Sequence, residues 1–282
     1  MVYKEIEWKN YKGVLLPVTP QHQSIYLTEK EQKELLKRSG VHIIRWMNEW
    51  DTPKATNFWY IIKDHFGGFE EYSAKNRKHV RQGLKNFSVK KIDLDYLLKN
   101  GYIIYNKAYN YYKYFKKDRN IKKIPSKEEF ISIYKKTAES SEFWGVFEKD
   151  TNKFVAFSEV TIRDNAVILG SMKLDPDYLK KYSAYALIHT RNEYYLKNQN
   201  YKYVSDGARS LLHETNIQEM LIRVFKFRKA YCKLNIAFSP LFKSIVIILY
   251  PFRKVIYVIN QQLFKKISTI LKMYEIAIKY GK

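Results

Sequence analysis

The sequence predicts an α+β protein with a mixed, largely antiparallel central sheet, and three observations support this. Three apolar, β-rich segments are separated by short polar turns, at residues 143–148, 154–162 and 166–174. Helical and strand patterns then alternate, at residues 182–198 (helix), 201–205 (strand), 215–225 (helix) and 228–237 (strand). Hydrophobic residues make up 46% of the chain, with only 10 Gly and 7 Pro, which is a globular composition. A strand meander followed by helix, strand, helix and strand is an α+β order.

The first half of the chain predicts an N-terminal α/β portion. Thr28 is a good helix N-cap, Glu31 completes a capping box, and Gly40 ends the helix. Further patterns predict an extended piece at 13–18, strands at 41–46 and 57–62, and helices at 69–86, 96–117 and 126–140. The expected division is residues 1–141 for this portion, 142–238 for the core and 239–282 for a basic helical tail.

The charge of the chain is strongly positive, with 51 Lys and Arg against 28 Asp and Glu, a formal net charge of +23. Such a field favours an anionic small molecule, a polyanionic cofactor, nucleic acid or an anionic membrane, although a Lys-rich solvated surface gives the same count. The single cysteine, Cys232, excludes an internal disulfide and reads as a core residue. The six His never take the spacing of a zinc helix, so no metal site is expected. The N-terminus lacks the apolar segment of a signal peptide, which predicts a cytoplasmic protein.

Two motifs resemble known families. The basic stretch Tyr72–Lys85 carries a Ser-x-x-x-Arg-x-x-x-Arg pattern, and Asp206–Arg228 has an Asn, Asn216, that opens the last helix before Lys-Phe-Arg closes it. Together with the order of elements after residue 143, they resemble the GNAT acyltransferases and the relatives of Fem peptidyltransferases found in bacterial envelope and capsule clusters. The resemblance implies an N-acyltransferase that moves an acyl group from acyl-CoA or acetyl-CoA to an amine of a cell-envelope, polysaccharide or lipid precursor.

The resemblance also implies where the donor binds. GNAT enzymes hold the coenzyme A pyrophosphate on an Arg/Gln-x-x-Gly-x-Gly/Ala turn, and residues 180–186 take that place here. The expected cofactor-binding residues are Leu174, Lys180, Lys181, Ser183, Ala184 and Asn216. Ser183 replaces the first glycine, which restricts close backbone approach. Fem relatives that lack this turn use aminoacyl-tRNA, so a tRNA donor, or a degenerate fold without a donor, stays open.

Several side chains are candidates for chemistry. Glu159 lies within an apolar strand and is a candidate base if burial raises its pKa, or else a solvated carboxylate. Asp206, Arg209 and His213 share one loop, where Asp206 and His213 are candidate catalytic residues and Arg209 a substrate-binding residue, unless the loop only caps a helix. Arg77 and Arg81 lie four residues apart and would bind a phosphate-bearing substrate, or form a solvated basic face.

The tail after residue 239 combines the apolar run Ser244–Phe252 with Lys and Arg residues. This pattern predicts a peripheral anchor on the anionic inner face of the membrane, with packing on the core or on a second subunit as the alternative. Two other functions compete with the enzyme: a nucleic-acid-binding protein, although no helix-turn-helix, zinc-finger or RNP pattern occurs, and a non-catalytic membrane scaffold. The sequence specifies no oligomeric state.

Overall fold

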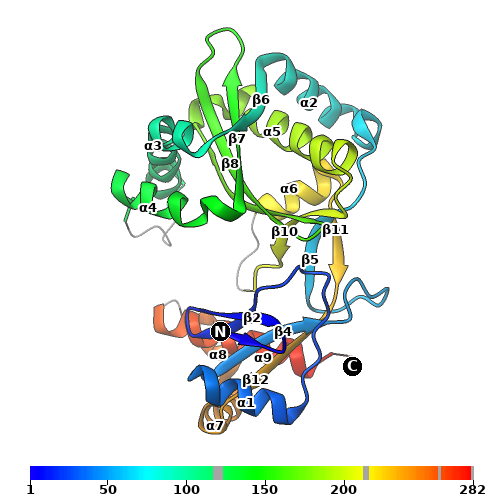
Figure 1. Cartoon of the computed structure of the whole chain (residues 1–282), viewed down its shortest axis with the longest axis vertical. Coiled ribbons are helices and arrows are strands. Elements are labelled where there is room, and N and C mark those ends of the chain that lie inside the picture. The colour runs from blue at the N-terminus through cyan, green and yellow to red at the C-terminus, as the bar shows by residue number, and fades with distance from the viewer. Residues whose placement is uncertain (117–122, 212–215, 260–261, 281–282) are drawn as a thin grey trace. The chain divides into compact units, whose positions relative to one another are not determined.

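The computed structural model describes residues 1–116, 123–211, 216–259 and 262–280. The chain forms two compact units (Figure 1). The first unit combines the N-terminal and C-terminal parts of the chain, residues 1–61, 208–219 and 228–282. The second unit holds residues 62–207 and 220–227. The chain passes from the first to the second within strand β5 (Trp59–Lys63).

This division differs from the expected boundaries after residues 141 and 238. Residues 62–141 supply helices and an edge strand to the sheet that was assigned to 142–238, because the three-stranded meander needs a covering layer on each face. The tail after residue 239 buries apolar side chains with the N-terminal strands, so it belongs to the first unit.

The second unit is built on a mixed sheet in the order β5-β10-β9-β8-β7-β6. Its other strands are β6 (Phe87–Ile92), β7 (Ser141–Glu148), β8 (Phe154–Arg163), β9 (Ala166–Leu174) and β10 (Tyr203–Ala208). Strands β6 to β9 are antiparallel neighbours, and β10 runs parallel to β9. The predicted meander and the predicted α+β fold are confirmed. Strand β6 is not among the predicted elements, because it directly follows the helix that ends at Asn86 and no turn residue separates the two.

Helices cover both faces of this sheet (Figure 1). The helices are α2 (Ala74–Asn86), α3 (Leu94–Asn110), α4 (Lys127–Thr137), α5 (Ser183–Asn192) and α6 (Asn216–Phe225). Helices α3 and α4 pack on one face through an aromatic cluster that includes Tyr105, Phe130, Tyr134 and Phe157. Helix α5 packs on the opposite face, where Ser158 points, because neighbouring residues of a strand face opposite ways.

The first unit contains a five-stranded sheet in the order β1-β2-β3-β4-β12, with α1 (Glu29–Ser39). The strands are β1 (Val2–Tyr3), β2 (Ile6–Tyr11), β3 (Val14–Pro17), β4 (Ile43–Asn48) and β12 (Lys233–Phe238). The single strand predicted over 228–237 is wrong in one respect. The chain changes partner at the buried Cys232, so that β11 (Arg228–Tyr231) pairs with β5 and β12 with β4. Cys232 is a core residue, as predicted.

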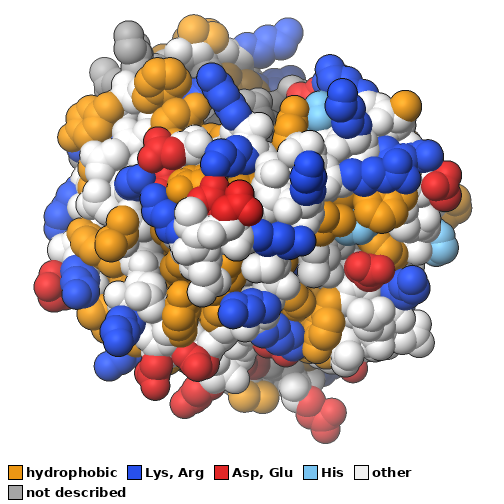
Figure 2. All heavy atoms as spheres, turned by 90° about the horizontal axis from the view of Figure 1, so that it is seen from above, with side chains coloured by type: hydrophobic (Ala, Val, Ile, Leu, Met, Phe, Trp, Pro, Cys, Tyr) orange, Lys and Arg blue, Asp and Glu red, His pale blue; other side chains and the backbone are white. Residues whose placement is uncertain are grey.

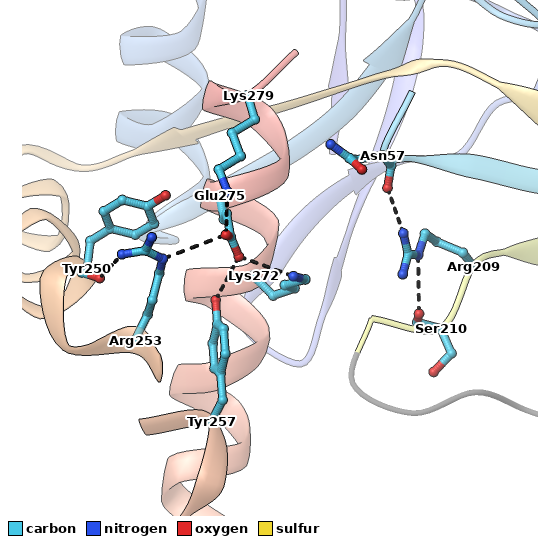
Figure 3. Close-up of polar contacts among 9 residues, drawn as sticks. All are labelled: Asn57, Arg209, Ser210, Tyr250, Arg253, Tyr257, Lys272, Glu275 and Lys279. Carbon is cyan, nitrogen blue, oxygen red and sulfur yellow. Dashed lines mark hydrogen bonds and ion pairs between the residues drawn. The ribbon is translucent and has the colours of Figure 1, made fainter. Parts of the chain in front are cut away.

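The tail forms α7 (Pro240–Leu249), α8 (Arg253–Val258) and α9 (Gln262–Ile278). Met273 and Ile276 of α9 are buried with residues of β4 and β12, so α9 is part of the core of the first unit. Glu275 joins α8 to α9: its carboxylate lies 2.8 Å from Lys279 Nζ and 3.2 Å from Lys272 Nζ, and Tyr257 OH donates to it at 3.3 Å (Figure 3). Among the described residues, no helix has the length and apolar character needed to cross a bilayer.

Candidate functional site

The most distinctive feature of the second unit is the point where β9 and β10 separate. Their parallel pairing covers only Ala166–Ile168 of β9 and Tyr203–Ser205 of β10. Strand β9 continues to Leu174 and β10 to Ala208. Parallel neighbours that stop pairing leave backbone N–H and C=O groups of the separating strands without a ladder partner. On β10, Gly207 N instead donates to Ser205 Oγ at 3.0 Å and the Ala208 carbonyl oxygen accepts from Gln218 Nε2 at 3.1 Å. The candidate catalytic residue Asp206 is the first residue of β10 beyond the paired part.

A β-bulge lies on β9 at the same level. Val160 pairs with Leu169 and Ser158 with Met172, so Glu159 faces two residues of β9, Gly170 and Ser171. A bulge leaves one residue outside the hydrogen-bonded ladder. Gly170 is exposed, and a side chain there would meet Glu159, since a Cβ would lie 3.1 Å from its carbonyl oxygen and 3.3 Å from Oε2.

Glu159 is the candidate base that the structure places beside this bulge. Its side chain is 8% exposed, and Ser141 Oγ donates to its Oε1 at 3.0 Å. The side chain lies on the face covered by α3 and α4, where Tyr134 OH and Ser171 Oγ are 2.8 Å apart. Burial raises the pKa of Tyr134. The Glu159 carboxylate therefore accepts one hydrogen bond, from the Ser141 hydroxyl, and lies beside the exposed residue Gly170.

The opposite face of β8 carries a buried arginine that sequence reasoning missed. Arg191 of α5 is 3% exposed and its Nη1 donates to Ser158 Oγ at 3.0 Å. Burial lowers its pKa to about 10, while Tyr195 and Asp206 act in the opposite direction. Its Nε and both amide atoms of Asn192 have no hydrogen-bond partner in the described part of the chain. The segment Leu-Ile-His-Thr-Arg-Asn mixes polar and apolar residues, so the sequence does not indicate that Arg191 and Asn192 are buried.

The fold is similar to that of several solved structures. No family model and no curated protein matches the sequence. Among solved structures, the crystal structure of FemX matches with a TM-score of 0.55 and 9% identity, over 85% of this chain and 86% of that chain. L-PGS from Bacillus licheniformis matches with a TM-score of 0.49 and 13% identity, over 96% of this chain and 85% of that chain. The PaiA N-acetyltransferase from Thermoplasma acidophilum, in complex with coenzyme A, matches with a TM-score of 0.30 and 16% identity, over 40% and 74%.

This chain has the GNAT-like fold. The similarity to FemX spans most of both chains, so the predicted resemblance to GNAT and Fem-like proteins is confirmed at the level of the fold.

The turn expected to bind a donor pyrophosphate in this GNAT-like fold is covered by the chain itself. Helix α2 packs on the N-terminus of α5 through Gly83, where a Cβ would lie only 2.6 Å from the carbonyl oxygen of Tyr182. Asn86 Nδ2 at the end of α2 donates to the carbonyl oxygen of Lys181 at 3.1 Å. Ser183 is fully buried, and its hydroxyl donates to the Tyr178 carbonyl oxygen at 3.3 Å. Helix α2 therefore contacts the carbonyl oxygens of Lys181 and Tyr182 in this turn, and Ser183 is closed off from solvent.

The other expected cofactor-binding residues lie around the turn in different settings. Lys180 is exposed, and Lys181 forms an ion pair with Glu148 at 2.6 Å. Leu174 and Ala184 are half-buried. Asn216 begins α6, as expected, but its side chain is outside the described set. Lys180 and Lys181 are both exposed, but the Lys181 charge is paired with Glu148, so Lys180 is the better placed of the two for an anion.

The two arginines of α2 are partly used within the second unit. Arg77 Nη2 lies 3.3 Å from Glu70 and donates to the Tyr72 carbonyl oxygen at 3.4 Å. The Arg81 guanidinium lies 5.3 Å from the Phe69 ring centroid and is exposed. Figure 2 shows Lys and Arg side chains spread over the visible face among hydrophobic and acidic ones. Arg81 is thus the better placed of the two for an anionic ligand.

The prediction that Asp206 and Arg209 share one loop is wrong, because Asp206 lies within strand β10, which continues to Ala208. Asp206 belongs to the second unit and Arg209, which follows the strand, to the first, and His213 lies outside the described residues. The Arg209 guanidinium stacks 4.1 Å from the Trp59 ring centroid, and its Nη1 donates to the Asn57 carbonyl oxygen at 3.0 Å (Figure 3). Lys229 Nζ lies 4.2 Å from the same ring.

A pocket of about 220 Å³ lies beside Trp59 in the first unit. Its lining includes Lys54, Asn57, Trp59, Tyr231 and Tyr280. Cationic and aromatic side chains without a carboxylate lining suit an anionic group with a planar or apolar part. Within the described residues, no cluster of His, Cys, Asp and Glu could hold a metal ion.

Proposed function

We propose that this protein is a transferase that forms an amide bond between an acyl or aminoacyl group and an amine. The observation that carries the proposal is the bulge of β9 beside Glu159, at the level where β10 leaves β9. A backbone N–H outside the ladder is a donor for the carbonyl oxygen of an activated acyl group. Amide formation needs such a donor, together with a base for the incoming ammonium.

The proposed reaction assigns one role to each group. Glu159 takes a proton from the acceptor ammonium, directly or through water, and the free amine attacks the acyl carbon. A carbon–nitrogen bond forms while the carbon–sulfur bond of a thioester, or the carbon–oxygen bond of an aminoacyl ester, breaks. The leaving thiolate or alkoxide takes up a proton from solvent. The bulge N–H stabilises the negative oxygen in between.

For the donor, the packing of α2 on α5 favours an aminoacyl ester over acyl-CoA. Helix α2 lies against the turn that would hold a pyrophosphate, through Gly83 beside the Tyr182 carbonyl oxygen and Asn86 bound to that of Lys181. The resemblance to Fem-like proteins implies aminoacyl-tRNA, and the net charge of +23 suits a polyanionic donor. An acyl-CoA remains the second candidate, because the exposed cations Lys180 and Lys181 of the turn suit a pyrophosphate.

For the acceptor, we propose an amine on an anionic envelope, polysaccharide or lipid-linked precursor. The net charge of +23 supports this, because such a field favours anionic ligands.

A donor panel tests the proposal. Purified protein is incubated with a mixture of amine acceptors and either acyl-CoAs of increasing chain length, read as free thiol, or a pool of charged tRNAs, read as transfer of radiolabelled amino acid. Label transferred from tRNA supports the favoured donor, and thiol release supports the second. Transfer from neither donor class would count against the transferase.

A further inference from the structure

The helices that follow β12 carry an apolar surface that none of the described residues of the first unit covers. Leu241, Ile245, Ile248 and Phe252 follow one another at intervals of four, three and four residues, so they form one stripe along α7 and the turn after it. Their exposed fractions are 73%, 42%, 65% and 62%. Val255 and Val258 on α8 are exposed by 65% and 83%. We call these six residues the tail stripe.

The tail stripe is not the face that α7 uses for packing. Val246 is buried, and Phe242 and Leu249 pack with it against α8 and α9. Helix α7 is therefore apolar on both its packed and its exposed side. A surface helix in water normally has a polar exposed side, and a helix that is apolar all round is found in a core or in lipid.

Exposed cations flank the tail stripe. Lys243 and Lys254 are exposed beside it, whereas Arg253, after Phe252, is half-buried and paired with Glu275 of α9. Between Met220 and Tyr274 the sequence has eleven Lys or Arg and no Asp or Glu. Exposed apolar residues flanked by cations match the boundary between acyl chains and anionic headgroups.

We propose that the tail stripe inserts into the surface of a bilayer rich in anionic lipid, with Lys243 and Lys254 at the level of the headgroups. Residues such as Phe252 and Ile248 would enter the acyl boundary, and the buried side of α7 would stay on the protein. This inference does not depend on the proposed transferase activity.

A second copy of the chain is a poorer occupant of the same surface. A two-fold contact through the tail stripe would bring Lys243 and Lys254 of both copies close together. Because the segment from Met220 to Tyr274 contains no carboxylate, it offers no acid to pair with them, and like charges at an interface core oppose association.

Vesicle flotation tests the inference with the full chain. Wild-type protein is mixed with vesicles of phosphatidylcholine alone or with about a third phosphatidylglycerol, at low and high salt. The double variant Ile248→Ser/Phe252→Ser is compared with Ile103→Ser, which removes an apolar side chain exposed by 68% in the second unit. We expect binding of wild type and I103S to anionic vesicles, and a loss of about tenfold or more in the double variant.

A charge variant and a folding control complete the test. Lys243→Gln/Lys254→Gln should weaken binding to anionic vesicles and reduce its salt dependence. Thermal melting of the Ser variants should match wild type, since Val246 and the packed side are unchanged. Equal binding by wild type and the double variant would overturn the inference. So would absence of binding to anionic vesicles, or a dimer that the same substitutions dissociate in the absence of lipid.

Discussion

The substitution Gly83→Ala tests the packing that closes the donor turn. In an isolated helix it would stabilise by about 1 kcal/mol, because Ala has the higher helix propensity. Here the new Cβ would lie 2.6 Å from the Tyr182 carbonyl oxygen and 3.1 Å from the Ala186 nitrogen. That carbonyl accepts hydrogen bonds from Tyr185 N at 3.1 Å and Ala186 N at 3.2 Å, so it cannot move without disturbing the first turn of α5.

The magnitude follows from these opposing terms. Overpacking of a close-packed contact costs about 1–3 kcal/mol, and the loss of order at the first turn of α5 adds to it. We therefore expect a net destabilisation of about 1–2 kcal/mol. The obstacle is backbone, and Tyr182 is already fixed at a positive φ of 68°, so relaxation is limited.

Hydrogen exchange of the α2 and α5 amides, read by mass spectrometry, measures this unit separately from the first. Faster exchange is expected in both helices of G83A. Lys78→Ala, on the exposed side of the same helix, serves as the matched control and should leave exchange within about 0.5 kcal/mol of wild type. A G83A protein whose α2 and α5 exchange more slowly than wild type would refute the proposed contact.

Two further predictions concern the first unit. Burial of Glu275 opposes ionisation, but hydrogen bonds from Lys279 and Lys272 outweigh it and lower the pKa of Glu275 to about 2. The ionised carboxylate therefore stabilises the folded state above the unfolded pKa of about 4.5, and this contribution is lost as the pH falls through 2. Glu275→Gln should cost about 2 kcal/mol at pH 7 and flatten the loss of stability below pH 4.5 in thermal melts; a variant with the wild-type pH profile would contradict this. Burial raises the pKa of Cys232 to about 12, so at pH 8 a thiol reagent should label the unfolded chain quickly and the folded chain slowly; equal rates would show that Cys232 is accessible.

Much of the fold follows from local signals. Thr28 with Glu31 forms the predicted capping box, and Ser126 with Glu129 forms a second one, because those hydrogen bonds need only four consecutive residues. The strands on either side of the turn at 150–153 pair as predicted. The β9 bulge depends on which residue of β8 meets which residue of β9, and the sequence pattern does not encode that register.

The rest of the site depended on contacts distant in sequence. From the sequence alone, Gly83 is a residue of low helix propensity within a predicted helix. The carbonyl oxygen of Tyr182, which is close in space, explains why no larger side chain fits there. Arg191 lies in a helix with polar and apolar residues mixed, so its burial against Ser158 has no local signature. The break between β11 and β12 at Cys232 has the same origin, because one continuous alternating segment pairs with two different strands.

The most direct test of the central claim is the single-turnover rate of amide formation in Glu159→Gln, with the donor that the panel identifies. The exposed Glu139→Gln is the matched control. The proposed roles predict a rate at least about 100-fold lower in E159Q, wild-type rates in E139Q, and donor binding that both variants retain. Wild-type turnover in E159Q would contradict the assignment of Glu159 as the base beside the β9 bulge.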